Sequence, residues 1–349
     1  AAILELGYED GVFTSVTRKN STGKVFYKED YSPDFTKADL KNQLSGDEAN
    51  MAGSSTSIRN SMTSGDFDLS RFFMNANSKI ARYVYEYDFN GFVVRKMYKK
   101  YNGSNEPGYD KNGIYGIEYV RDDYGRILEM YYLDEDGDRT EDRYGVAGRR
   151  FTYDDATGFQ SSESYFDSGG NPCFNELKYS VGKSAWNPET RVLTEEFFGP
   201  DGQPCINMMS FSSCILSFSD NGYDVSYFGT DGAPAVYYDR SLQGASSDGG
   251  YHLARYKVDR AGRPNDMQFF GTDSLPCSSL QGAHHLVMDF DAYNRLLRVV
   301  NYGVNGNRAK VREGYAEMRY DYDDDGNLVL AQVLGQKGEP VNCMAGFSS

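Results

Sequence analysis

Side chains that could carry acid–base or nucleophilic chemistry are few in this chain. Its 349 residues include three histidines and five cysteines, and they form no Ser/His/Asp, His-Glu-x-x-His or glycine-rich phosphate-binding motif. His284 and His285 are adjacent, so on a strand their rings point to opposite faces and cannot bind one ion together. His252 lies in a Ser/Gly-rich stretch and is a candidate ligand-binding residue. The sequence predicts that the chain is not an enzyme.

One acidic stretch resembles a cation site. Asp321, Asp323 and Asp325 precede Gly326 with the spacing of the first half of a calcium-binding loop. The twelfth position holds Gln332, where such a loop needs a bidentate glutamate. We therefore expect no cofactor, and keep these aspartates as a low-ranked calcium site. Carboxylate pairs of a glycan-acting hydrolase are a third-ranked alternative, because sequence cannot place two acids across a cleft.

The cysteines follow a structural pattern. Cys173, Cys205 and Cys277 each come after a turn proline, and the same position elsewhere holds a small apolar residue, Ala235, Ala309 or Val341. Such a position is a small buried site. The spacing fits no metal motif. Free thiols are predicted, with a bridge such as Cys173 to Cys205 as the alternative.

An internal repeat must position all of these residues. A turn residue follows each aromatic/aspartate strand and returns at steps of 34, 33, 32, 32, 40, 32 and 32 residues. Such a regular step indicates a repeat array of about eight units, each of roughly 32 residues. The markers are Gly91, Gly125, Gly158, Thr190, Gly222, Gly262, Asn294 and Gly326.

Each unit reads as a β-hairpin followed by a looped return. Short aromatic and β-branched runs alternate with Gly, Pro, Asn and Asp turns, which is typical of strands and hairpins. The predicted fold is all-β: tandem hairpins in an elongated, curved, solenoid-like array, with a closed propeller as the alternative. In an isolated hairpin one face would remain exposed to solvent, so we expect neighbouring hairpins to stack and bury it. Two columns are expected inside, one led by Tyr85, Tyr119 and Tyr256, the other by Tyr87, Trp186 and Phe218.

An aspartate stands before each marker and has a structural explanation. Asp accepts hydrogen bonds from backbone N–H groups two residues on, which stabilises a turn. A turn role is therefore predicted over a catalytic one for the column Asp88, Asp122, Asp155, Asp259, Asp291 and Asp323.

The N-terminal part has a different pattern. Two β-rich runs around residues 12–17 and 24–27 predict an opening hairpin, and Ser32-Pro33 is a good helix start. We expect residues 1–82 to form a small α/β cap with a helical insertion at 32–80. Residues 83–349 form the array. A cap fits because repeat arrays need their end faces blocked.

Charge excludes some partners. The net charge is −15, which repels nucleic-acid phosphates and anionic lipids. No apolar run is long enough to span a bilayer, so neither nucleic acid nor direct membrane insertion is expected. Aromatic rings with polar turns suit recognition of a glycan or protein. The rings expected to remain exposed are Tyr98, Tyr101, Tyr109, Tyr237 and Tyr238.

The tip motifs resemble a known repeat. TyrAspPheAsnGly at 87–91, AspAspTyrGlyArg at 122–126 and TyrAspAspAspGlyAsn at 322–327 are similar to the YD repeats of Rhs and teneurin-like proteins. TyrPheAspSerGlyGlyAsnPro at 165–172 is more weakly similar to aromatic repeats of bacterial cell-wall-binding and toxin proteins. The resemblance implies a bacterial, extracellular or cell-surface β-array that binds or encloses. The first-ranked function is a non-enzymatic binding or adhesion module; the runner-up is a structural scaffold or shell within a larger chain, assembly or oligomer.

Overall fold

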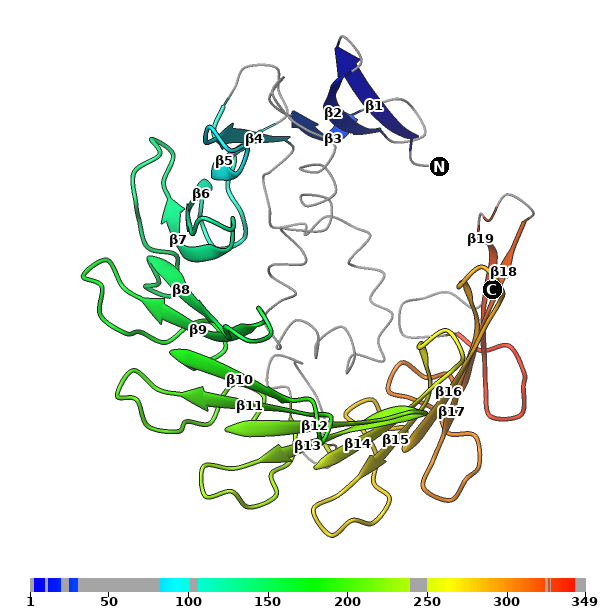
Figure 1. Ribbon diagram of the computed structural model, residues 1–349. Coiled ribbons are helices and arrows are strands. Elements are labelled where there is room, and N and C mark those ends of the chain that lie inside the picture. Colours follow the sequence, from blue (N-terminus) through cyan, green and yellow to red (C-terminus); the bar gives the residue numbers. More distant parts are fainter. Residues whose placement is uncertain are drawn as a thin grey trace. The chain divides into compact units, whose positions relative to one another are not determined.

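The computed structural model describes residues 3–9, 12–19, 25–30, 82–100, 106–238, 250–323, 326 and 328–342, with side chains from Tyr83 onward. These residues form nineteen β-strands and no helix (Figure 1). The all-β prediction is confirmed. Within the described ranges no helix could cross a bilayer.

The described residues divide into two compact units, and the division falls inside β10. The first unit takes residues up to 183 together with 199–203, and the second takes the rest. Strands of the first unit are β1 (Ile3–Glu9), β2 (Val12–Lys19), β3 (Val25–Asp30), β4 (Arg82–Tyr87), β5 (Val93–Lys99), β6 (Gly116–Arg121), β7 (Ile127–Leu133), β8 (Gly148–Tyr153), β9 (Gln160–Phe166) and the start of β10 (Val181–Asn187). Those of the second are β11 (Val192–Phe198), β12 (Ser213–Ser219), β13 (Gly222–Phe228), β14 (Leu253–Val258), β15 (Pro264–Phe270), β16 (His285–Phe290), β17 (Leu296–Tyr302), β18 (Glu317–Tyr322) and β19 (Leu328–Leu334).

Within each unit, strands of the repeats that are neighbours in sequence pair antiparallel. In the first unit the pairing runs from β4 to β10, and in the second from β11 to β19. Within the described part β19 pairs only with β18, and β1 only with β2. The sheet is therefore open, and the closed propeller is not observed.

Repeats that the structure describes in full contain three turns, as the glycine pattern predicts. The hairpin tip comes first. A second turn follows, closed by bonds such as Asp167 N to Asn171 O at 2.9 Å, and a third by Asn175 N to Tyr179 O at 2.9 Å. The glycine columns mark left-handed backbone. Ser274, with φ of 62°, and Asn294, with φ of 69°, occupy glycine positions in the same conformation.

One predicted inward column is correct and the other needs correction. Tyr85, Tyr119 and Tyr256 are buried, as expected for one face of a strand. In the second column Tyr87 and Phe218 are half-buried and Trp186 is exposed. This second column lies at the hairpin tips, where the sheet ends and less of each ring is covered.

The N-terminal part of the structure contains the two strands expected before the array. β2 and β3 pair antiparallel, which is the predicted opening hairpin, and β3 then pairs parallel with β4. The helical insertion at 32–80 lies outside the described residues. The boundary at residue 82 therefore stays a prediction.

The cysteines in the described part of the chain form no disulfide, as predicted. Cys173, Cys205 and Cys277 are half-buried and Cys214 is buried. Burial raises the pKa of the Cys173 and Cys277 thiols to about 11. Both are therefore protonated at neutral pH and are poor nucleophiles.

Candidate binding edge at the hairpin tips

The aspartate and arginine of the tip motif form an ion pair within the turn. In the turn between β6 and β7, Asp122 Oδ1 accepts hydrogen bonds from the backbone N–H groups of Tyr124 at 3.0 Å and Arg126 at 2.9 Å. Its Oδ2 accepts from Arg126 Nε at 2.6 Å. Asp259 with Arg263 and Asp291 with Arg295 repeat the arrangement. Hydrogen bonds and the arginine charge outweigh desolvation and lower the pKa of Asp122 and Asp291.

The arginine then reaches the next hairpin. The guanidinium carbon of Arg126 lies 4.8 Å from the centre of the Tyr153 ring, and Arg295 lies 4.8 Å from that of Tyr322. Arg263 covers Phe290 at 4.7 Å. These are cation–π contacts between consecutive hairpins. We call each set of aspartate, arginine and following ring a tip clasp.

The tyrosine hydroxyl closes the clasp. Tyr153 donates to the carbonyl of Ile127 at 2.8 Å, and Tyr322 to that of Leu296 at 3.1 Å. Where Arg121 replaces the tyrosine, its Nε donates to the equivalent carbonyl, that of Val93, at 2.9 Å. The YD-like motif is thus used to join neighbouring repeats.

We expect Tyr322→Phe to lower the free energy of unfolding by about 1 kcal/mol, because it removes one hydrogen bond and keeps the ring beneath Arg295. Urea unfolding followed by fluorescence of Trp186, the single tryptophan, measures the change. Tyr302→Phe is the control, because that ring stacks on His285. Equal effects of the two variants would contradict the clasp.

The predicted turn role of the aspartate column is confirmed, with one correction. Asp88 accepts from the N–H groups of Asn90 and Phe92, both at 2.9 Å. In the turn between β8 and β9 the acceptor is Asp154, which binds the Thr157 N–H at 2.7 Å. The prediction of Asp155 there was wrong by one residue, because this turn has one residue more before its glycine.

The calcium candidate stays a low-ranked prediction. Asp321 is exposed on β18 opposite Leu330, and Asp323 is half-buried at the tip. Asp325 lies outside the described residues. The described part of the chain has no group of three His, Cys, Asp or Glu side chains that could hold a metal ion.

The predicted binding tyrosines lie mostly inside their units. Tyr98 is 6% exposed, and its ring packs 5.4 Å from that of Tyr83, so its expected exposure was wrong. Tyr109 is half-buried, 5.5 Å from the Tyr115 ring. Tyr101 lies outside the described residues.

The second pair of predicted tyrosines is half-buried in the second unit. Tyr237 packs against the rings of Tyr227 at 5.0 Å and Tyr251 at 5.3 Å. Tyr238 donates its backbone N–H to Met209 O at 2.9 Å. The aromatic residues around Tyr237 are therefore explained by packing within the unit and do not require a ligand.

The His252 ring is hydrogen-bonded to the protein backbone. Its Nδ1 lies 2.7 Å from Tyr227 O and 3.3 Å from Ala235 O. His284, at the same repeat position, places Nδ1 2.9 Å from Phe269 O and 3.1 Å from Cys277 O. Carbonyls only accept, so Nδ1 carries the proton in both rings. Each of the two histidines thus connects two backbone segments by hydrogen bonds from its Nδ1.

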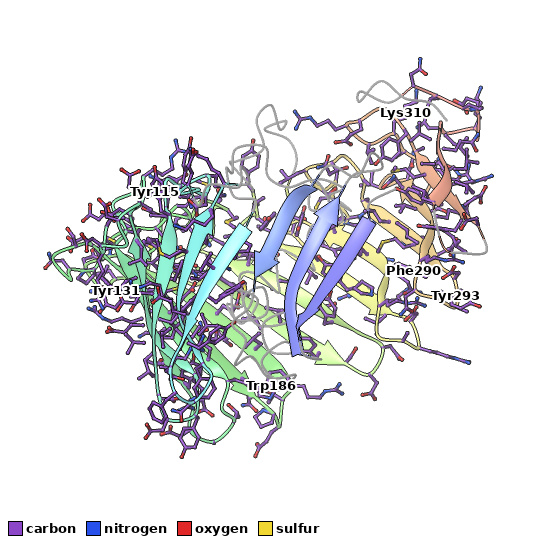
Figure 2. The ribbon with its side chains drawn as sticks, turned by 90° about the horizontal axis from the view of Figure 1, so that it is seen from above. Tyr115, Tyr131, Trp186, Phe290, Tyr293 and Lys310 are labelled. Atoms are coloured by element: carbon purple, nitrogen blue, oxygen red, sulfur yellow. The ribbon has the colours of Figure 1, made fainter. Side chains whose placement is uncertain are left out.

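The most exposed rings are at the hairpin tips. In the first unit, Phe89 is 97% exposed, Tyr124 83% and Phe159 64%. They belong to three consecutive tips, those of β4–β5, β6–β7 and β8–β9. We call them the tip row. In the second unit Tyr293 is 80% exposed and lies at its hairpin's tip edge with Phe290 (Figure 2). Sequence reasoning missed these rings; the available signal was an aromatic residue inside a turn, where no strand face covers it.

A recess in the second unit marks a missing clasp. Between β13 and β14, Tyr223 stands in the arginine position and Val258 in the ring position. A recess of about 770 Å³ lies there, lined by Phe218, Tyr223, Tyr256, Asp224, Arg255 and others. The rings of Tyr223 and Tyr256 stack at 4.6 Å. The recess therefore follows from the local loss of the motif.

Comparison with known proteins assigns no family. No family model and no curated protein matches the sequence. Solved structures of TcdB2-TccC3, alone and with Cdc42, match 95% of this chain at 12% identity and a TM-score of 0.25. A Photorhabdus luminescens Tc holotoxin pore matches 77% at 12% identity and a TM-score of 0.16. The chain spans 15% of the first two matched chains and 16% of the third.

Proposed function

We propose that this chain is a non-enzymatic binding module of an extracellular or cell-surface protein. The hairpin array is the scaffold, and the tip row of the first unit is its recognition edge. The tip row is the observation that carries the proposal. Three large rings on consecutive tips are left in water, while the aspartates of the same turns, Asp88, Asp122 and Asp154, accept hydrogen bonds from local backbone N–H groups. A partner that covers such rings gains roughly 1.5–3 kcal/mol for each one fully buried.

The chemistry of the other polar groups supports a non-catalytic role. The clasp aspartates are bound by arginine, and the pKa values of Asp122, Asp259 and Asp291 lie below the ordinary range. They stay ionised at neutral pH and are poor general acids. His252 and His284 each point a ring nitrogen at backbone carbonyls. The partner under this proposal is a glycan or a protein.

The second candidate function is a purely structural one, as a scaffold or shell segment of a larger protein or assembly. It is favoured by the tip clasps, which join consecutive hairpins through side chains as well as through the sheet. A scaffold of this kind needs no exposed ring at its tips.

We expect the triple variant Phe89→Ala, Tyr124→Ala, Phe159→Ala to lose about ten-fold or more in affinity, which corresponds to 1.4 kcal/mol or more. Arrays of glycans and of extracellular proteins identify the partner, and calorimetry then measures its affinity. Tyr293→Ala, an exposed tip ring of the second unit, is the control. Unchanged binding by the triple variant would refute the tip row as the recognition edge, and the absence of any bound partner would leave the scaffold role.

A further inference from the structure

We propose that the tip row binds an extended, neutral glycan chain, with a ring beneath every second sugar. This inference rests on the proposed function and specifies its ligand. It is carried by the position of the three rings along one edge, by the polar groups beside them and by charge.

The three tips that carry the rings follow one another at regular intervals along one sheet edge. The hairpins β4–β5, β6–β7 and β8–β9 lie side by side, because β5 pairs with β6 and β7 with β8. Consecutive tips are therefore two strand spacings apart, or about 10 Å. This interval is comparable to the disaccharide repeat of an extended β-1,4-linked chain, in which alternate sugars present the same face.

The tips also carry the polar groups that a sugar needs. Asn90 is exposed beside Phe89, and Asp123 beside Tyr124. Asp155 is exposed in the turn that ends at Phe159. A sugar ring has an apolar C–H face and a rim of hydroxyl groups. An aromatic ring covers the first, and carboxylate or amide groups at the side accept hydrogen bonds from the second.

Charge selects the class of glycan. The chain has a net charge of −15, and two of the three tips present an exposed aspartate. Anionic chains such as uronic-acid or sulfated glycans would be repelled. A neutral chain meets no such repulsion.

The second unit lacks such a row among its described tips. Tyr293 is exposed there, but the tip of β14–β15 carries Arg260 and Ala261, and that of β12–β13 carries Asp220 and Asn221. Tyr293 is therefore an exposed tip ring whose neighbouring described tip has no exposed ring, and the tip row can be compared with it.

The test uses the full chain with cellobiose, cellotetraose and cellohexaose, measured by calorimetry. One tip can hold a disaccharide, whereas a longer chain engages a second and third ring intramolecularly. Affinity is expected to rise by about ten-fold or more from cellobiose to cellohexaose. Maltohexaose, whose α-1,4 linkage curves the chain, should bind at the cellobiose level.

The central ring provides the sharpest variant. Tyr124→Ala should return cellotetraose to nearly the affinity of cellobiose, because the two outer tips are four strand spacings apart and a chain of four sugars cannot reach both. Tyr124→Phe keeps the ring and should retain the length dependence. Tyr293→Ala should change nothing. Circular dichroism of each variant checks that it is folded.

Several outcomes would overturn the inference. They are affinity that does not depend on chain length, equal binding of maltohexaose, or no effect of Tyr124→Ala. Tip-dependent binding of a protein, or of phosphatidylcholine vesicles, in place of the glycan would also do so. A tip-dependent protein partner would leave the proposed function standing, whereas no tip-dependent ligand of any kind would remove both.

Discussion

Replacing Glu317 with alanine is expected to destabilise the second unit by about 3 kcal/mol. The Glu317 side chain is fully buried, and three arginines surround it. Arg298 Nε lies 2.8 Å and Arg319 Nε 2.6 Å from its Oε1, and an Arg308 nitrogen lies 2.9 Å from Oε2. Alanine would leave three neighbouring cations without their shared anion. The arginines are partly exposed and regain water, which holds the loss at the lower end of the range for buried pairs.

The Glu317 contribution should also depend on pH. Burial alone would raise the pKa of the carboxyl, but the hydrogen bonds from Arg298 and Arg319 and the arginine charges outweigh it, so the pKa lies below its ordinary value of 4.5. A lowered pKa in the folded state means that the stabilisation is complete above pH 4.5 and is lost as pH falls toward the folded-state value.

Urea unfolding followed by Trp186 fluorescence, at pH 7 and below pH 4, measures both effects. The difference between wild type and Glu317→Ala should shrink at the lower pH. Glu189→Ala is the control, because Glu189 is exposed and makes no ion pair within the described residues. An unfolding curve of Glu317→Ala that matches the control at pH 7 would refute the role of the cluster.

Gly222→Ala is expected to destabilise the same unit by about 3 kcal/mol or more. Gly222 has φ of 155°, and a Cβ atom there would lie on the carbonyl oxygen of Tyr256 and 2.9 Å from Cα of Lys257. Both obstacles are backbone atoms of the neighbouring strand β14. The substitution must therefore push β13 away from β14, where Gly222 pairs with Lys257.

Gly232→Ala separates this clash from the general effect of replacing a glycine. Gly232 has φ of 75°, and a Cβ atom added there would meet no other atom within 4 Å, so only the left-handed backbone strain of about 1–2 kcal/mol applies. Thermal unfolding of the two variants should differ clearly. Equal losses would mean that β13 and β14 are less closely packed than Gly222 indicates.

Much of the fold could be predicted from spacing alone. The steps between Gly91 and Gly326 reflect a physical unit, because each hairpin needs the same turns and the same neighbour. The role of Asp122 and its equivalents was also predictable, since a short carboxylate before a glycine turn bonds to local backbone N–H groups. Such interactions are local in sequence.

The candidate site was not predictable in the same way. Tyr98 and Tyr124 are both tyrosines close to turns, yet one is 6% and the other 83% exposed. The difference depends on which strands cover each ring. The Ser/Gly-rich stretch around His252 suggested a ligand, but its Nδ1 lies against backbone carbonyl oxygens of residues 25 and 17 positions earlier in the sequence. Contacts of that range are formed only when repeats are laid side by side.

The sequence by itself determined a tandem all-β array with polar turns. Strands of period two and turn residues with left-handed backbone are consequences of local backbone geometry. Only the tertiary structure decided which aromatic rings became clasps between hairpins and which, like Phe89, Tyr124 and Phe159, remained in water. The physical reason is that the burial of a ring depends on how two neighbouring hairpins pack against each other. The residue type at one position does not indicate which parts of its ring the next hairpin will cover.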